Sequence, residues 1–188
     1  VDLLLYDFGA VSVSYTLRSR GTWSEWIELG CALAEQPEWA KDARVRVEEL
    51  ARTIGPSIHK FCLPDVVEDY MLYEFDWAPQ AAGLEGILAQ HGGSLAQLLR
   101  TERSPLSEQE ITDALGTRVS FGPGDLALID WNGAILFDDV PEDVRAVLEF
   151  ANVQLLEMRF LDRQLDKSLD QAFEALGRRE WRRLWKPP

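Results

Sequence analysis

The feature that most constrains this chain is a long apolar seam close to its C-terminus. Between residues 144 and 176, ten positions follow one another at alternating spacings of four and three residues. Nine of them are apolar and one is an aspartate: Val144, Leu148, Ala151, Leu155, Met158, Asp162, Leu165, Leu169, Ala172 and Leu176. Such a heptad pattern predicts a helix that packs against other helices along its whole length.

The predicted helix is longer than the domain that it follows. From Glu142 to Leu176 it would extend about 50 Å, from the rise per residue of an α-helix. A compact domain of 188 residues is only about 40 Å across. We therefore expect at least the C-terminal half of the helix either to protrude or to pack on a second copy.

Asp162 is the one charged residue in the seam. A carboxylate buried without a partner is costly. We expect it either to pair with Arg159 or Arg163, or to mark the point where the seam leaves the core for solvent. In coiled coils such a residue can also fix the register.

The composition is that of an ordinary folded domain. Hydrophobic residues make up 46% of the 188 residues, and no uncharged apolar run is long enough to span a bilayer. The two cysteines, Cys31 and Cys62, are too few for a disulfide framework and indicate a reducing compartment, with a single Cys31–Cys62 bridge as the alternative.

The charge is unevenly distributed. The net charge of −13 argues against nucleic-acid binding, which needs clustered basic residues. Residues 178–188 carry +4, however, so residues 1–177 carry −17. Because this segment also contains Trp181, Arg182, Arg183 and Trp185, it could lie at a membrane surface, cap an acidic helix, or serve only as a linker.

The remaining patterns predict an α+β fold. Hairpins and strands are expected at 3–17 (turning at Gly9), 69–77, 118–122, 126–131 and 134–138, with Asn132-Gly133 as the strongest turn signal. Helices are expected from the capping box Thr22–Glu25, over 38–54, 81–91 and 94–101, from the capping box Ser107–Glu110 to Gly116, and over 142–176.

These elements predict one mixed or antiparallel sheet, built from hairpins, with helices on one face and the long helix following it. The expected division is a globular domain at 1–141, the heptad-patterned helix at 142–177 and the basic tail at 178–188.

Catalytic motifs are missing from the sequence. The only histidines are His59 and His91, and the pair His59–Cys62 lacks the further ligands of a metal site. We therefore predict no catalytic, cofactor-binding or metal-binding residue. An acidic set could in principle hold a divalent cation, although helix capping explains it better: Glu68, Asp69, Asp138, Asp139, Glu142 and Asp143.

Two segments carry a family resemblance. The stretch VLEFANVQLLEMRFLDRQLDKSLD, after a strand and DDVPED, resembles the late helix of bacterial membrane-anchored proteins of unknown function. Those proteins are distantly similar to the required-for-meiotic-nuclear-division family. The stretch YDFGAVSVSYTL resembles the hairpin that opens the domain in that family. The resemblance implies a location on the cytoplasmic side of the inner membrane, with a C-terminal anchor, and it brings no catalytic motif.

Two classes of function follow from these patterns. The first is a non-catalytic scaffold that assembles with itself or with partner helices through the seam, of which we select Val144, Leu148, Leu155, Met158, Asp162, Leu165, Leu169 and Leu176. The second is an acidic-cleft ligand-binding domain or metal-dependent enzyme at Asp138, Asp139 and Glu142. A rise in melting temperature with divalent cations would favour the second class.

Overall fold

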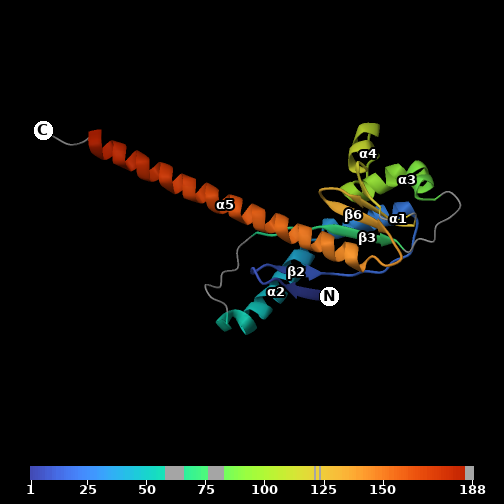
Figure 1. The fold of residues 1–188 in the computed structure, drawn as a ribbon, viewed down its shortest axis with the longest axis horizontal. Coiled ribbons are helices and arrows are strands. Elements are labelled where there is room, and N and C mark those ends of the chain that lie inside the picture. The colour runs from blue at the N-terminus through green and yellow to red at the C-terminus, as the bar shows by residue number, and fades with distance from the viewer. Residues whose placement is uncertain (58–65, 76–82, 121, 123, 185–188) are drawn as a thin grey trace.

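The computed structural model describes residues 1–57, 66–75, 83–120, 122 and 124–184, without the side chains of Leu84 and of residues 177–184. It contains two sheets, four helices close to them, and a fifth helix that extends far from the globular part (Figure 1). The α+β class and the long C-terminal helix are therefore confirmed.

The N-terminal hairpin forms as predicted, from β1 (Asp2–Leu5) and β2 (Val11–Ser14) with Asp2 opposite Ser14. Gly9 takes a φ of 98° in the turn, a value that glycine adopts without a steric penalty. Our expectation that this hairpin joins the other strands in one sheet is wrong, because β1 and β2 form a separate two-stranded sheet. Hydrogen bonds from the hairpin to helices, described below, hold it instead.

The main sheet has the strand order β3-β6-β5-β4. Its strands are β3 (Met71–Phe75), β4 (Thr117–Val119), β5 (Leu126–Ile129) and β6 (Gly133–Phe137). β3 and β6 are parallel and the other pairs are antiparallel, so the sheet is mixed. The turn at Asn132-Gly133 is confirmed, with the Asp130 amide donating to the Gly133 carbonyl at 2.9 Å.

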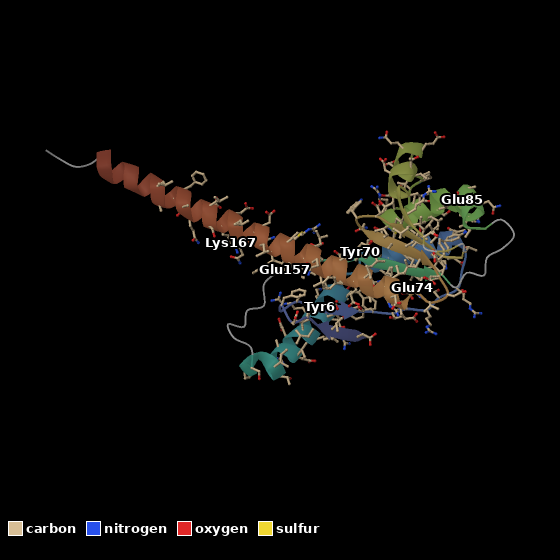
Figure 2. The ribbon with its side chains drawn as sticks, viewed as in Figure 1. Tyr6, Tyr70, Glu74, Glu85, Glu157 and Lys167 are labelled. Atoms are coloured by element: carbon tan, nitrogen blue, oxygen red, sulfur yellow. The ribbon has the colours of Figure 1, made fainter. Side chains whose placement is uncertain are left out.

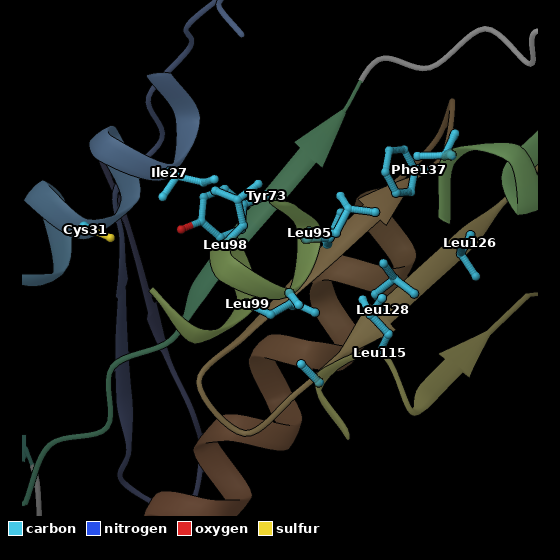
Figure 3. Packing of buried hydrophobic residues seen from close by; sticks show 14 residues of the cluster. Ile27, Cys31, Tyr73, Leu95, Leu98, Leu99, Leu115, Leu126, Leu128 and Phe137 are labelled. Carbon is cyan, nitrogen blue, oxygen red and sulfur yellow. The ribbon is translucent and has the colours of Figure 1, made fainter. Parts of the chain in front are cut away.

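Three helices cover one face of this sheet: α1 (Trp23–Ala34), α3 (Gly83–Arg100) and α4 (Glu108–Ala114). Both predicted capping boxes are present, at the starts of α1 and α4. Figure 3 shows the core between these helices and the sheet, in which Leu95, Leu99 and Phe137 are completely buried.

The prediction of two short helices at 81–91 and 94–101 is wrong, because α3 continues through Gly92 and Gly93. A Cβ at Gly92 would lie 3.4 Å from Leu115, and one at Gly93 would lie 3.8 Å from Ile111. The two glycines therefore face the region of α4, where a small residue allows close packing. Tertiary packing outweighs the local tendency of glycine to end a helix.

The hairpin lies against helices α2 (Pro37–Ile54) and α5 (Glu142–Leu184), and a 3₁₀ turn at Gly55–Ser57 follows α2. The Tyr15 hydroxyl donates to Asp42 Oδ2 at 2.6 Å, and the Tyr15 ring lies 4.8 Å from that of Trp39. On the other side, Ser12 donates to Glu149 of α5. These contacts make the hairpin a bridge between two helices.

The helix α5 covers part of the second face of the main sheet, where Leu148 packs with Ala127, Ala134 and Leu136. It begins at Glu142 as predicted and continues past Leu176 to Leu184. Figure 1 shows that its C-terminal half lies outside the globular part. This half therefore protrudes from the single chain, and its packing on a second copy stays a prediction.

Cys31 is buried and free, and Cys62 lies outside the described residues, as does His59. His91 packs beside Trp23, with the ring centroids 5.2 Å apart. None of the helices in the described part of the chain is both long enough and apolar enough to cross a bilayer.

Candidate assembly surface on α5

The helix α5 has two apolar faces over its first half, and one of them, the inner face, contacts the domain. Leu148 and Val153 are buried on this inner face, and Asn152, Leu156 and Phe160 are half-buried. These residues recur at helical spacing and therefore lie on one side of the helix.

Two ion pairs align α5 with β3. Arg145 contacts Glu74 at 3.0 Å, and Arg159 contacts Glu68, which lies just before the strand. Fourteen helical residues and six extended residues both span about 20 Å, so one register satisfies both pairs. The helix therefore runs antiparallel to β3, and its direction out of the domain is set by the inner face.

The second face carries a row of exposed apolar side chains, which we name the outer stripe: Val147, Leu155, Met158, Leu161, Leu165, Leu169, Phe173 and Leu176. At the helical repeat of 3.6 residues they all lie within about 60° of Met158. Most of the inner face lies on the opposite side of the helix, and Leu148 lies at the edge between the two faces. Met158, Leu165 and Phe173 are 67%, 62% and 70% exposed. Such a row over more than seven helical turns is not accounted for by the fold of one chain.

The predicted seam divides between these two faces. Val144 and Leu148 pack on the main sheet, whereas Leu155, Met158, Leu165, Leu169 and Leu176 belong to the outer stripe. A strict heptad drifts by about 20° per repeat around a straight helix, so its residues do not stay on one face. The outer stripe also contains three residues that the heptad pattern did not predict: Val147, Leu161 and Phe173. Searching for a 3.6-residue repeat instead of a 3.5-residue repeat would have found them.

Asp162 lies where α5 leaves the domain. Phe160 is the last half-buried residue, and each residue from Leu161 to Leu176 is exposed. The second of the two expectations for Asp162, that it marks the exit to solvent, is confirmed. Arg159, one of its two expected partners, contacts Glu68.

An aromatic cluster widens the apolar surface beside the start of the outer stripe. Phe150 of α5 lies 6.2 Å from Tyr6, which lies 5.5 Å from Phe8, between ring centroids. Figure 2 shows Tyr6 beside α5, and Lys167 on the part of the helix beyond the domain. Phe8 and Phe150 are 42% and 49% exposed.

The polar contacts of the hairpin keep this cluster in place. Tyr15 and Arg46 both donate to Asp42 Oδ2, at 2.6 Å each. These two hydrogen bonds lower the pKa of Asp42, and burial together with the same contact raises the pKa of Tyr15. The carboxylate therefore stays ionised and holds the hairpin on α2 at neutral pH.

The other predicted groups do not form a visible site. Among the described residues, no three histidine, cysteine, aspartate or glutamate side chains come together in a way that could hold a metal ion. Asp138 accepts a hydrogen bond from the Val140 amide at 2.9 Å, and Glu68 pairs with Arg159. Of the predicted tail, the backbone of residues 181–183 is helical, and Trp185 lies outside the described residues.

The fold and the outer stripe define a small α+β domain that carries a long amphipathic helix. Residues 1–143 match the protein family described as "Uncharacterized protein MJ0711, N-terminal domain", and the chain belongs to this family. The uncharacterised protein MJ0711 of Methanocaldococcus jannaschii is 25% identical to it over 140 residues, which are 73% of this chain and 41% of that protein. No solved structure matches the chain.

These similarities agree with the prediction of a family of unknown function, and they assign no activity. The family match ends at residue 143, where α5 begins, so it concerns the globular part. The chain spans less than half the length of the archaeal relative. The resemblance to bacterial membrane-anchored proteins and to the required-for-meiotic-nuclear-division family stays a prediction.

Proposed function

We propose that this domain is a non-catalytic assembly module that self-associates through the outer stripe of α5. The observation that carries this proposal is the row of apolar side chains that continues along α5 after the helix has left its own domain. Partner helices of another chain would meet the same surface, and the occupant that we propose is a second copy of this chain.

The stability of the helix supports the proposal. A single helix of about 20 residues without tertiary contacts is marginal in water, since helices in proteins are stabilised mostly by packing of their apolar face. Beyond Phe160, each α5 side chain that the structure describes, from Leu161 to Leu176, is exposed and lacks such packing. Burying the outer stripe against a second helix would supply it.

The test is the mass of the chain in solution. Sedimentation equilibrium over two decades of concentration is expected to show a reversible dimer or a higher oligomer. The helical content from circular dichroism is expected to rise over the same range, as the far half of α5 gains its partner. A monomer with constant helicity at all concentrations would contradict the proposal.

The non-catalytic part of the proposal has its own test. Adding Mg²⁺, Mn²⁺ or Zn²⁺, or removing metals with a chelator, is expected to leave the melting temperature of the domain unchanged. A ligand bound only by the folded state would raise it. A rise with one of these ions would favour the ligand-binding class at the acidic residues near the start of α5.

The location that we propose is the cytoplasmic side of a bacterial inner membrane, with the module acting as a scaffold there. The support is the resemblance stated above and the basic, tryptophan-containing segment 178–188 on an otherwise acidic chain. Co-sedimentation with anionic vesicles at low salt tests it. Replacing Arg182 and Arg183 by glutamate is expected to abolish that binding, and unchanged binding would refute this role of the segment.

A further inference from the structure

The outer stripe is nearly palindromic. About a centre between Leu161 and Asp162, Val147 corresponds to Leu176 and Met158 corresponds to Leu165. An antiparallel pair of identical helices brings such corresponding positions together, because a twofold axis then crosses the helices at the centre. In this arrangement Val147 would meet Leu176, and Met158 would meet Leu165. The other leucines correspond to polar residues, yet each lies one residue from an apolar one of the second copy: Leu155 beside Leu169 and Leu161 beside Leu161.

Side-chain size follows the same symmetry. Phe150 corresponds to Phe173 and Ala151 to Ala172. From the angular positions on the helix, Phe150 and Ala172 lie on the same side of the stripe, and Ala151 and Phe173 lie on the other. In the antiparallel pair each phenylalanine thus faces an alanine of the second copy, which is the alternation of large and small residues that packs facing helices well.

Charge also favours this orientation. The start of α5 is acidic, with Glu142 and Asp143 both exposed, and residues 178–183 hold four arginines and one glutamate. The palindromic register places Glu142 and Asp143 opposite positions 181 and 180 of the second copy, between the arginine pairs 178–179 and 182–183. A parallel pair would instead bring like charges together at both ends and align the two helix dipoles unfavourably.

We infer that two copies of this chain pair antiparallel through the outer stripes, with the twofold axis close to Asp162. This inference rests on the proposed self-association and adds the orientation and register of the two helices. It also leaves the two globular domains at opposite ends of the helix pair.

Spin labels on the polar side of α5 test the orientation. Gln164→Cys and Gln171→Cys place labels at exposed positions, in a chain with Cys62 replaced by serine; Cys31 is buried. In the antiparallel pair the two copies of position 164 are about 8 Å apart along the axis and those of position 171 about 29 Å apart. We therefore expect a distinctly longer distance for the second label by double electron–electron resonance. Equal distances for both labels would indicate a parallel pair and overturn the inference.

Exchange of large and small residues tests the register. Phe173→Ala and Ala151→Phe are each expected to weaken dimerisation about tenfold or more, and the double variant is expected to restore it. Without such rescue, the register is refuted. A chain that stays monomeric throughout would refute the proposed function itself, so the two failures are distinguishable.

Discussion

Truncating two leucines of the outer stripe gives the sharpest test of self-association. Leu165 and Leu169 are 62% and 55% exposed in the single chain. Fully burying a leucine contributes about 1.5–3 kcal/mol, so covering the exposed part contributes about 1–2 kcal/mol for each side chain. A symmetric pair contains four of these side chains, and alanine retains one methyl group of each.

We therefore expect Leu165→Ala/Leu169→Ala to weaken dimerisation by about 3–5 kcal/mol, which corresponds to about a 10²- to 10⁴-fold increase in Kd. Sedimentation equilibrium measures this change. The folded domain should be unaffected, because both residues lie outside its core and alanine favours the helix. The melting temperature of the dilute chain should accordingly stay the same.

A matched control separates this effect from a general change in the helix. Gln164→Ala/Gln171→Ala changes two equally exposed residues of the same segment on the other side of α5, and it should leave Kd unchanged. The reasoning is refuted if the leucine variant associates as tightly as the unchanged chain, or if the glutamine variant loses association to the same extent.

Three further predictions follow from individual contacts. Gly30→Ala should destabilise the domain by about 1–3 kcal/mol in urea unfolding, because its Cβ would lie 2.3 Å from the Tyr73 hydroxyl oxygen. Tyr73→Phe should rescue this variant, since it removes a buried hydroxyl that has no hydrogen-bond partner among the described residues. An equal loss of stability in the double variant would contradict this contact. Asp162→Leu should tighten dimerisation about tenfold by removing two carboxylates close to the twofold axis, and weaker association would contradict that placement. Acidification below pH 4.5 should lower the melting temperature, because hydrogen bonds from Thr22 hold the pKa of Glu25 below its ordinary value of 4.5. The stabilisation is present above pH 4.5 and is lost as the Glu25 carboxylate is protonated. Glu25→Gln should show a smaller drop, and an identical pH profile would contradict this account.

Local signals in the sequence predicted those elements whose cause is local. The capping box of Thr22 and Glu25 depends only on neighbouring residues, and so does the turn at Gly9. In contrast, the continuation of α3 through Gly92 depends on Leu115, which is distant in sequence. Propensity alone could not reveal that contact.

The topology shows the same limit. The strand signals of the hairpin and of the main sheet are equally clear, yet strand patterns do not specify their partners. Whether β2 pairs with another strand or lies against helices is decided by side chains such as Ser12 and Tyr15, whose partners Glu149 and Asp42 are distant in the sequence. The single predicted sheet was therefore a reasonable but incorrect combination of correctly predicted strands.

The candidate surface was predictable in part. The apolar repeat correctly indicated a long helix, and two of its residues, Leu165 and Leu169, are exposed in the single chain. The repeat could not show which residues contact the domain, because Leu148 and Leu155 occupy equivalent heptad positions, yet Leu148 is buried on the main sheet and Leu155 is exposed. Only the register of α5 against β3, set by Arg145 and Glu74, separates them.

This division of α5 into two faces also affects how much conformational entropy the proposed pairing of two copies would cost. The first half of the helix is fixed on the domain by Leu148 and by the ion pair of Arg159 with Glu68. The part of the outer stripe on this half is therefore ordered in the single chain, so binding a partner there would cost little conformational entropy. In the far half, each side chain described from Leu161 to Leu176 is exposed, so we expect this half to be ordered fully only when a partner covers it. In an antiparallel pair, each ordered half receives the less ordered half of the second copy. In the proposed dimer, the ordered surface of one chain would therefore be the template on which the helix of the other chain becomes stable. Folding of the far half of α5 would then be coupled to dimerisation.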